Sequence, residues 1–420
     1  MATTRRQFIK RSAQLVSLSV VLPKLWLTNA HAQSLPADPN RRILVVIQLL
    51  GGNDGLNTVV PYTDSRYYSL RPTLALKESG LKDSQGRSTI ISNAFALNPN
   101  LEKIKEIYDQ NRVAIVQGVG YPNPSGSHFE STDIWQTANE SGKGRGWLGR
   151  YADQTVTDPS ALAAVAFSLS LPKSLSADRV VTPNLIPTNL SIFDFETDLQ
   201  FPANRANRLS VFKGNVSRSV SAEGFSKSIS RSGLVTINNV ERIKAAASGF
   251  ASSVTYPQNE PLALSLKLAA QIITAIPEAN LMYVPWGFFD HHSDQARFHP
   301  LYLKQYSEAV KAFYDDLAER GLANNTVILQ WSEFGRRPEE NGSAGTDHGA
   351  ASSIFIMGNQ VRGGLYGQQP SLAATDLDSA GNMKFTVDFR SVYATILDNW
   401  LGVDSQSILG AKFENLGFLG

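Results

Sequence analysis

The feature that most constrains this chain is a short apolar run that ends in acidic and imidazole side chains. Residues 326–331 are mostly apolar and are bounded by polar residues, which is typical of a buried strand. Glu333 follows almost directly, and an Asp347-His348-Gly349 sequence lies a little further along. In open parallel sheets, ligands bind beyond the carboxyl ends of the strands. The segment therefore predicts a ligand site at the end of a buried strand.

The same pattern, an apolar run followed by a carboxylate, a hydroxyl or an imidazole, recurs along the chain. The further runs span residues 42–50, 112–119 and 282–286. Segments with helical spacing alternate with them, at residues 101–108, 262–276 and 301–322. Strands that alternate with helices favour a mainly parallel sheet covered on both faces. We therefore expect an α/β fold, a three-layer αβα sandwich.

The N-terminus is typical of a targeting segment. A twin-arginine pattern at residues 4–10 is followed by an apolar stretch at 15–27 and by Ala30-His31-Ala32, which is a small-x-small cleavage site. This order predicts a twin-arginine signal peptide over residues 1–32 and a periplasmic or secreted protein. Residues 33–420 are expected to form a single domain. The Ser-rich part at about 170–256 is expected to be an insertion or cap, with a helix near 228–247.

Removal of the signal peptide changes the charge of the chain. The peptide carries five basic residues and no acidic one, so the rest keeps 34 of the 39 Lys and Arg against all 37 Asp and Glu, a net charge of −3. A chain with this balance lacks the basic surface that nucleic-acid binding needs. No apolar run in the remainder is long enough for a membrane span. Cysteine is absent, so a metal site would use His, Asp, Glu and hydroxyl oxygens.

Two strand ends carry groups for which a structural role competes with a functional one. Asp54 lies in a Gly-Gly-Asn-Asp-Gly turn, and a carboxylate between glycines also suits a metal ion. Ser127 begins a predicted helix and can form a capping box with Glu130, while a hydroxyl there also suits a metal-activated nucleophile. His128 beside it is a candidate ligand, acid or packing residue. Both kinds of role stay open from these residues alone.

The sequence Phe-Asp-His-His-Ser-Asp-Gln at 289–295 is a clearer metal pattern. Asp290 and His292 combine a carboxylate with an imidazole at a strand end, and both groups suit divalent cations, although a polar loop is the alternative. Arg336 lies between Glu333 and the Asp-His-Gly sequence, where its guanidinium could bind phosphate or sulfate oxygens in a bidentate manner. We expect Arg336 and Asn53 to contact the substrate.

Together with the signal peptide, five motifs resemble the DUF1501 family of exported bacterial proteins. They are LLGGNDGLNTVVPY, GSHFESTDIWQTA, FDHHSDQ, WSEFGRRPEENGSAGTDHGAASSIFIMG and DFRSVYATILDNWLG. This family looks like a branch of the alkaline phosphatase and sulfatase superfamily. The resemblance implies a large αβα sandwich with two divalent cations about 4 Å apart. It also implies a Ser or Thr that bridges the two cations and attacks phosphorus or sulfur.

The resemblance also implies roles for particular residues. Ser127 matches the nucleophile, and the matching metal ligands are Asp54, Asp290, His292, Glu333 and His348. Phe334 stands where the superfamily has an imidazole, so one ligand is missing unless His128 supplies it. An alternative register pairs Asp347 with His348 as ligands.

Our hypothesis from the sequence is an exported, metal-dependent hydrolase of phosphate or sulfate esters. It would hold one or two divalent ions, namely zinc, manganese or calcium, and would act on a small-molecule or polymer ester. The alternative hypothesis is a catalytically degenerate relative that binds a periplasmic partner or an envelope polymer. The missing imidazole favours this alternative, and the remaining His and carboxylate residues favour the enzyme.

Overall fold

The computed structural model describes residues 38–186, 210–217, 225–249 and 251–420. The expected signal peptide, residues 1–32, lies outside this part, as do portions of the Ser-rich segment. The helix expected at 228–247 is α8 (Phe225–Gly249). Within the described ranges, no helix combines the length and the apolar character that a membrane crossing requires.

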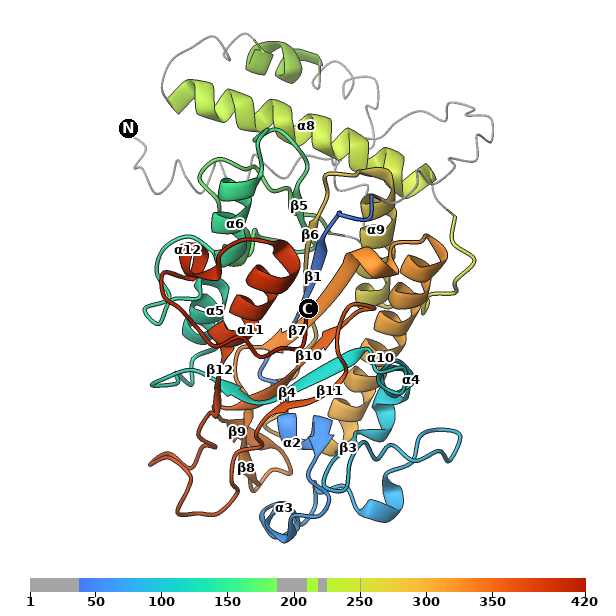
Figure 1. The fold of residues 1–420 in the computed structure, drawn as a ribbon, viewed down its shortest axis with the longest axis vertical. Coiled ribbons are helices and arrows are strands. Elements are labelled where there is room, and N and C mark those ends of the chain that lie inside the picture. The colour runs from blue at the N-terminus through green and yellow to red at the C-terminus, as the bar shows by residue number, and fades with distance from the viewer. Residues whose placement is uncertain (1–37, 187–209, 218–224, 250) are drawn as a thin grey trace.

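One mixed sheet forms the centre of the fold (Figure 1). Its order is β11-β4-β10-β7-β1-β6-β5, and β12 pairs with β4. The strands from β7 to β5 are parallel, whereas β10 is antiparallel to both of its neighbours. The strands are β1 (Ile43–Leu49), β4 (Val113–Gly120), β5 (Ala164–Ala166), β6 (Leu281–Trp286), β7 (Thr326–Ser332), β10 (Ser352–Met357), β11 (Gly364–Gly367) and β12 (Val387–Asp388).

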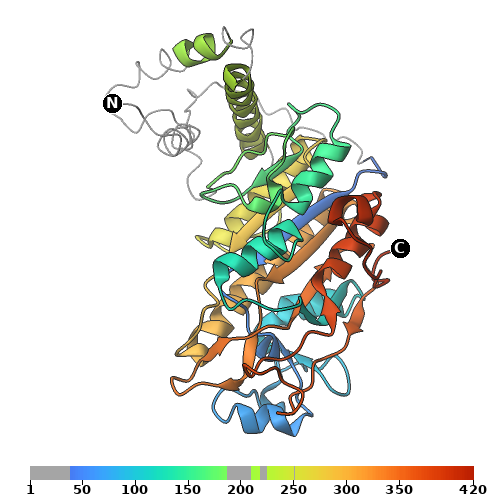
Figure 2. The same ribbon diagram turned by 90° about the vertical axis from the view of Figure 1, so that its left-hand side faces the viewer.

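Helices cover both faces of this sheet, as the two views show (Figure 1, Figure 2). Successive strand residues point to opposite faces, so Val45 and Ile47 of β1 enter one core and Leu44 and Val46 enter the other. This arrangement confirms the expected three-layer α/β fold. The first core is covered by α4 (Glu102–Tyr108), α9 (Pro261–Ala275) and α10 (Gln295–Glu319), and the second by α5 (His128–Thr137), α6 (Trp147–Thr155), α11 (Phe389–Ile396) and α12 (Ser405–Leu409).

Smaller elements lie beyond the main sheet. They are α2 (Gly55–Thr58), α3 (Ser65–Leu70), and two short sheets, β2 (Val59–Val60) with β3 (Ala96–Leu97) and β8 (Arg336–Glu340) with β9 (Thr346–His348). Nothing in the sequence indicated strands between Glu333 and His348. The segment is a hairpin whose register pairs Arg336 with His348, so the chain turns back and returns His348 to the end of β7.

The central strands stop at one level. Leu49 of β1 is in register with Trp286 of β6 and with Ser332 of β7. The chain segments that leave these three strands therefore start side by side. Gly51 makes the close approach possible, because a Cβ at this position would lie 2.6 Å from the backbone nitrogen of Asp290, and its φ of +106° suits glycine.

Candidate metal centre

Three ligand-type atoms from the strand ends meet at one point. His292 Nε2 lies 2.9 Å from His348 Nε2, and Asp290 Oδ1 lies 3.1 Å from the first nitrogen and 3.0 Å from the second. Ligands of a tetrahedral zinc ion at about 2.0–2.1 Å stand on the order of 3.3 Å apart. The spacing of these three atoms is therefore close to that of a metal coordination shell.

His128 adds a fourth group from the start of α5. Its Nε2 lies 3.4 Å from Asp290 Oδ2, and its ring centroid lies 4.5 Å from that of His348. The nitrogen is shielded from solvent and has no hydrogen-bond partner among the described residues. His128, Asp290 and His348 each offer one ligand atom within 4.8 Å of the others. We call Asp290, His292, His348 and His128 the His–Asp cluster.

The outer nitrogens of the three imidazoles determine their protonation. Nδ1 of His128 lies 2.7 Å from Glu333 Oε1, Nδ1 of His292 lies 3.1 Å from Asp347 Oδ1, and Nδ1 of His348 lies 2.8 Å from the Gly126 carbonyl. Carbonyl and carboxylate oxygens accept hydrogen bonds, so each Nδ1 is the donor.

In a neutral imidazole the other nitrogen then carries a lone pair. Three Nε2 lone pairs and the Asp290 carboxylate thus face one another with no proton between them. This donor set fits a divalent cation, and outer hydrogen bonds of this kind are the usual support of metal-bound histidine.

Neighbouring charged groups shift the pKa values of residues in and around the cluster. The hydrogen bond to Glu333 raises the pKa of His128 above its ordinary value, against a smaller opposing effect of burial. For Asp290, burial acts to raise the pKa, but the hydrogen bond from Arg336 and the positive charge of its guanidinium outweigh burial and hold the pKa below its usual range. A hydrogen bond from Asn341, and the one from His292, likewise lower the pKa of Asp347. These carboxyl groups are anionic at neutral pH.

Glu333 and Asp347, which the sequence suggested as metal ligands, lie outside the cluster. Both carboxylates orient an imidazole instead. Glu333 is buried, and its Oε1 also accepts a hydrogen bond from the Gly51 backbone N–H at 2.8 Å. Oε1 of Glu333 thus already accepts hydrogen bonds from two donors. We assign Glu333 and Asp347 to the outer layer of the site, which orients the imidazoles.

Arg336 does not face a substrate, contrary to expectation. It is 1% exposed, and its guanidinium donates to Asp290 Oδ1 at 2.7 Å. It also donates to backbone carbonyls, which belong to Gly51, Gly52, Phe289 and Thr346. The guanidinium therefore fixes Asp290 against the end of β1.

Asp54 is also placed away from the cluster, and its expected role as a metal ligand does not hold. Its Oδ2 lies 2.5 Å from Arg71 Nη1 in a buried ion pair and also accepts a hydrogen bond from Gln295. Its Oδ1 accepts from the Leu56 N–H at 3.1 Å and caps α2. Both carboxylate oxygens of Asp54 thus accept hydrogen bonds from the protein, and its role is structural. The sequence carries no signal for Arg71 as the partner.

Asn53, expected to bind substrate, is buried next to Asp54. Its Oδ1 lies 3.0 Å from His299 Nε2, and its amide nitrogen donates to Thr58 Oγ1 at 2.9 Å. Burial lowers the pKa of His299 to about 3, so this imidazole stays neutral. The side chains of Asn53, Asp54, Arg71 and His299 form what we call the buried polar network.

Ser127 caps α5, as the sequence suggested, and its Oγ accepts from the Glu130 N–H at 3.4 Å. The expected capping box is altered, because the Glu130 carboxylate accepts a hydrogen bond from Ser125 Oγ instead. Ser127 is exposed and lies in the chain between Gly126 and His128, both of which contact the cluster or its outer layer. Its hydroxyl is thus held at the margin of the site.

Phe334, where the motif resemblance led us to expect an imidazole, packs against two histidines of the cluster. Its ring is 1% exposed and lies 4.8 Å from the ring of His128 and 4.7 Å from that of His348, measured between centroids. A Cβ at Gly52 would lie only 2.4 Å from this ring, so the glycine leaves the space that the ring occupies. Phe334 is therefore an apolar support for two cluster histidines.

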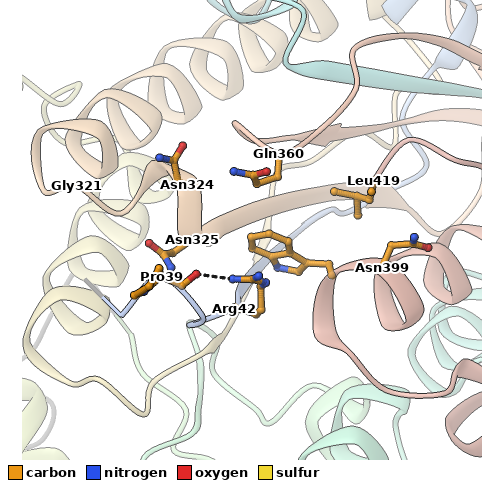
Figure 3. A pocket seen from close by; sticks show the side chains of 10 residues that line it. Pro39, Arg42, Gly321, Asn324, Asn325, Gln360, Asn399 and Leu419 are labelled. Carbon is orange, nitrogen blue, oxygen red and sulfur yellow. Dashed lines mark hydrogen bonds between the residues drawn. The ribbon is translucent and has the colours of Figure 1, made fainter. Parts of the chain in front are cut away.

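A cleft of about 720 Å³ opens beside the cluster. Its lining residues are Leu50, Gly51, His128, Phe129, Thr132, Asp133, Gly287, Phe288, Asp290 and Glu333. Another cavity, of about 480 Å³, lies at the opposite ends of the strands, near the start of β1 and β7, and Arg42 and Asn325 are among its lining residues (Figure 3). No His, Asp or Glu lines that cavity, whereas the cleft adjoins the cluster, so the cleft is the candidate substrate site.

The fold and the cluster thus define an α/β protein with a metal-type donor set at the carboxyl edge of its sheet. Residues 274–411 match the family model described as a protein of unknown function, DUF1501, which confirms the resemblance seen in the motifs. A comparison with curated proteins gives no match.

Solved structures give distant likenesses. A sulfatase from Pseudoalteromonas sp. is 12% identical, with 100% of this chain and 76% of that chain covered and a TM-score of 0.40. A protein in the alkaline phosphatase superfamily from Vibrio parahaemolyticus is 8% identical, with 88% and 72% covered and a TM-score of 0.35. The alkaline phosphatase of the Antarctic bacterium TAB5 is 10% identical, with 76% and 93% covered and a TM-score of 0.32.

Proposed function

We propose that this protein is a metal-dependent hydrolase of phosphate or sulfate esters that binds one divalent cation. The observation that carries the proposal is the convergence of three Nε2 atoms on Asp290 while every Nδ1 donates outward. Asp290, His292 and His348 would hold the ion. The class of ester follows the motif resemblance described above.

The composition of the cluster narrows the choice of ion. Calcium prefers six to eight oxygen ligands, whereas this cluster offers mainly imidazole nitrogen. Zinc and manganese thus remain from the three ions expected from the sequence, and zinc suits the close spacing best. A second ion is disfavoured, because Arg71 occupies Asp54 and Phe334 offers no ligand atom.

A bound cation would offset negative charge that develops on the ester oxygens and would favour ionisation of an attacking hydroxyl. The protein residues supply the rest of the chemistry. His128 lines the cleft and its Nε2 faces the cluster, so His128 is a fourth ligand or a general acid and base. Ser127, at the margin, is the proposed nucleophile.

The test is turnover by the purified zinc-loaded protein against a panel of phosphate and sulfate esters. We expect hydrolysis of one class, its loss in Ser127→Ala, and retention in Ser125→Ala, a change in the same loop. Full activity in Ser127→Ala would contradict the nucleophile. Bound zinc with no hydrolysis of any ester would contradict the enzyme and favour the binding protein considered from the sequence.

Export is a separate part of the proposal, supported by the twin-arginine pattern at residues 4–10. N-terminal sequencing of the protein from a periplasmic or culture fraction should find a chain that begins at Gln33. An uncleaved chain confined to the cytoplasm would contradict it.

A further inference from the structure

Two phenylalanines in the cleft are exposed to an unusual degree for large apolar side chains. Phe129 is 88% exposed and Phe288 is 76% exposed. Both line the cleft that His128 and Asp290 also line. Scattered apolar residues on a surface need no explanation, but apolar residues gathered at a polar site mark a surface for a ligand.

The backbone around Phe288 presents this ring while it holds the cluster. Gly287 has a φ of +100°, and a Cβ there would lie 2.6 Å from the ring of Phe289. Phe289 turns into the core, whereas Phe288 turns out and has its ring centroid 6.3 Å from that of Tyr302. Asp290 then reaches the cluster. The same short turn thus places an apolar group and a cluster residue side by side.

Phe129 provides the second apolar wall from a separate element. It follows His128 in the first turn of α5, and Thr132 of the next turn lines the same cleft. The position of His128 is fixed by its 2.7 Å contact with Glu333, so the start of the helix that carries Phe129 is fixed as well. The two phenylalanines therefore belong to the two segments that deliver cluster residues.

The charges in the cleft are negative. The ionisable lining residues besides His128 are Asp133, Asp290 and Glu333, and no Lys or Arg is among them. Asp133 pairs with Lys173 at 2.7 Å, and the other two carboxylates contact cluster histidines. Apart from a bound cation, no positively charged side chain lines the cleft to attract an anionic substituent.

We propose that this cleft holds the alcohol part of the ester, and that this part is an uncharged aryl group or a similarly flat apolar group packed against Phe129 and Phe288. The inference rests on the proposed function, since it gives the substrate class of the same site. The cleft volume of about 720 Å³ lies in the ordinary range for small-molecule sites.

Binding of two inert phosphonates to the zinc-loaded protein tests this inference without turnover. Phenylphosphonate and methylphosphonate share the anionic head and differ in the apolar group. Calorimetry should find phenylphosphonate bound about tenfold more tightly, as expected for aromatic contacts. The double variant with Phe129→Ala and Phe288→Ala should bring the ratio close to one, while Val211→Ala, at an exposed apolar residue of the helical segment 210–217, should leave it unchanged.

The outcomes separate the inference from the proposed function. Equal affinities of the wild type for both phosphonates would overturn the inference and leave the metal site intact. Failure of both phosphonates to bind the zinc-loaded protein would overturn the proposed function as well. Binding to phosphatidylcholine vesicles that depends on both phenylalanines, with a phosphonate ratio near one, would assign the two rings to a lipid surface and overturn the substrate class.

Discussion

The His–Asp cluster and the buried polar network are built from the same kinds of residue at the same edge of the sheet. In the network, Asp54 has Arg71 as its partner and His299 has Asn53. In the cluster, the inner nitrogens have only one another and the exposed carboxylate of Asp290.

This difference distinguishes acids and imidazoles that stabilise the fold from those that can bind a ligand. Where the protein supplies a donor for every acceptor, the group stabilises the fold. Where several imidazole nitrogens are aimed at one point and lack a donor, we expect a cation to bind. Asp and His side chains occur in both regions, so residue type alone does not distinguish them.

The largest expected effect comes from breaking the buried polar network. Arg71→Met leaves the Asp54 carboxylate buried without its cation, and removal of one partner of a buried pair costs about 3–5 kcal/mol. Denaturant unfolding should find this loss in the free energy of unfolding, with zinc still bound. Unchanged stability, or lost zinc in a folded variant, would mean that the network belongs to the metal site.

The converse change is His292→Ala. The side chain is 46% exposed, so the free energy of unfolding without metal should stay within about 0.5 kcal/mol of the wild type. The loss of one ligand should weaken zinc binding by roughly 10²–10³-fold, given about 10–16 kcal/mol shared by four ligands. Competition titration with a chelating dye measures the affinity, and an affinity within tenfold of the wild type would exclude His292 as a ligand.

A smaller effect is expected in the outer layer. Glu333→Gln removes the carboxylate that fixes His128 and should weaken zinc binding or activity by about 10–100-fold. The same change should lower the pKa of His128, because the hydrogen bond to Glu333 is what raises it. Histidine resonances of the metal-free protein, followed by NMR against pH, would reveal the shift.

The raised pKa of His128 also gives the pH dependence its sign. In the metal-free wild type, its stabilising effect is fully present below the unfolded pKa of about 6.5 and is lost as pH rises through the higher folded value. Zinc binding follows the opposite course, since the metal needs the neutral imidazole. The measurement is the difference in free energy of unfolding between the metal-free wild type and Glu333→Gln. A difference that grows in favour of the wild type above pH 7 would contradict this assignment.

The smallest effect is expected from Phe334→His, which adds one more imidazole beside His128 and His348. Because Arg71 holds Asp54, the number of bound zinc ions should stay at one. Elemental analysis of the variant decides this, with the wild type as control. Two zinc ions per chain would mean that the network can open and that Phe334 alone prevents a second site.

The sequence predicted the central strands and the set of Asp290, His292 and His348, because each lies in a motif with a local signal. It could not predict the role of Asp54, since its partner Arg71 comes from a segment with no signal of its own. It also could not distinguish candidate metal ligands from residues that only orient a ligand. Glu333 and His128 are both strand-end groups, and only the contact between their side chains shows which one faces inward.

The hairpin β8–β9 shows a further limit. Its turn brings His348 back to the end of β7, and the polar residues between Arg336 and His348 carry no periodic pattern that would have predicted two strands. Phe129 and Phe288 were missed for a simpler reason. Phe129 lies inside a quoted motif and Phe288 directly precedes another, but nothing in a sequence distinguishes an exposed aromatic ring from a buried one.

The most direct test of the central claim is X-ray absorption at the zinc edge of the purified protein. We predict one zinc per chain with an imidazole-rich shell of nitrogen and oxygen at about 2.0–2.1 Å, and loss of that signal in His292→Ala. A shell without imidazole scattering, or a spectrum that His292→Ala leaves unchanged, would contradict the assignment of the His–Asp cluster as the metal site.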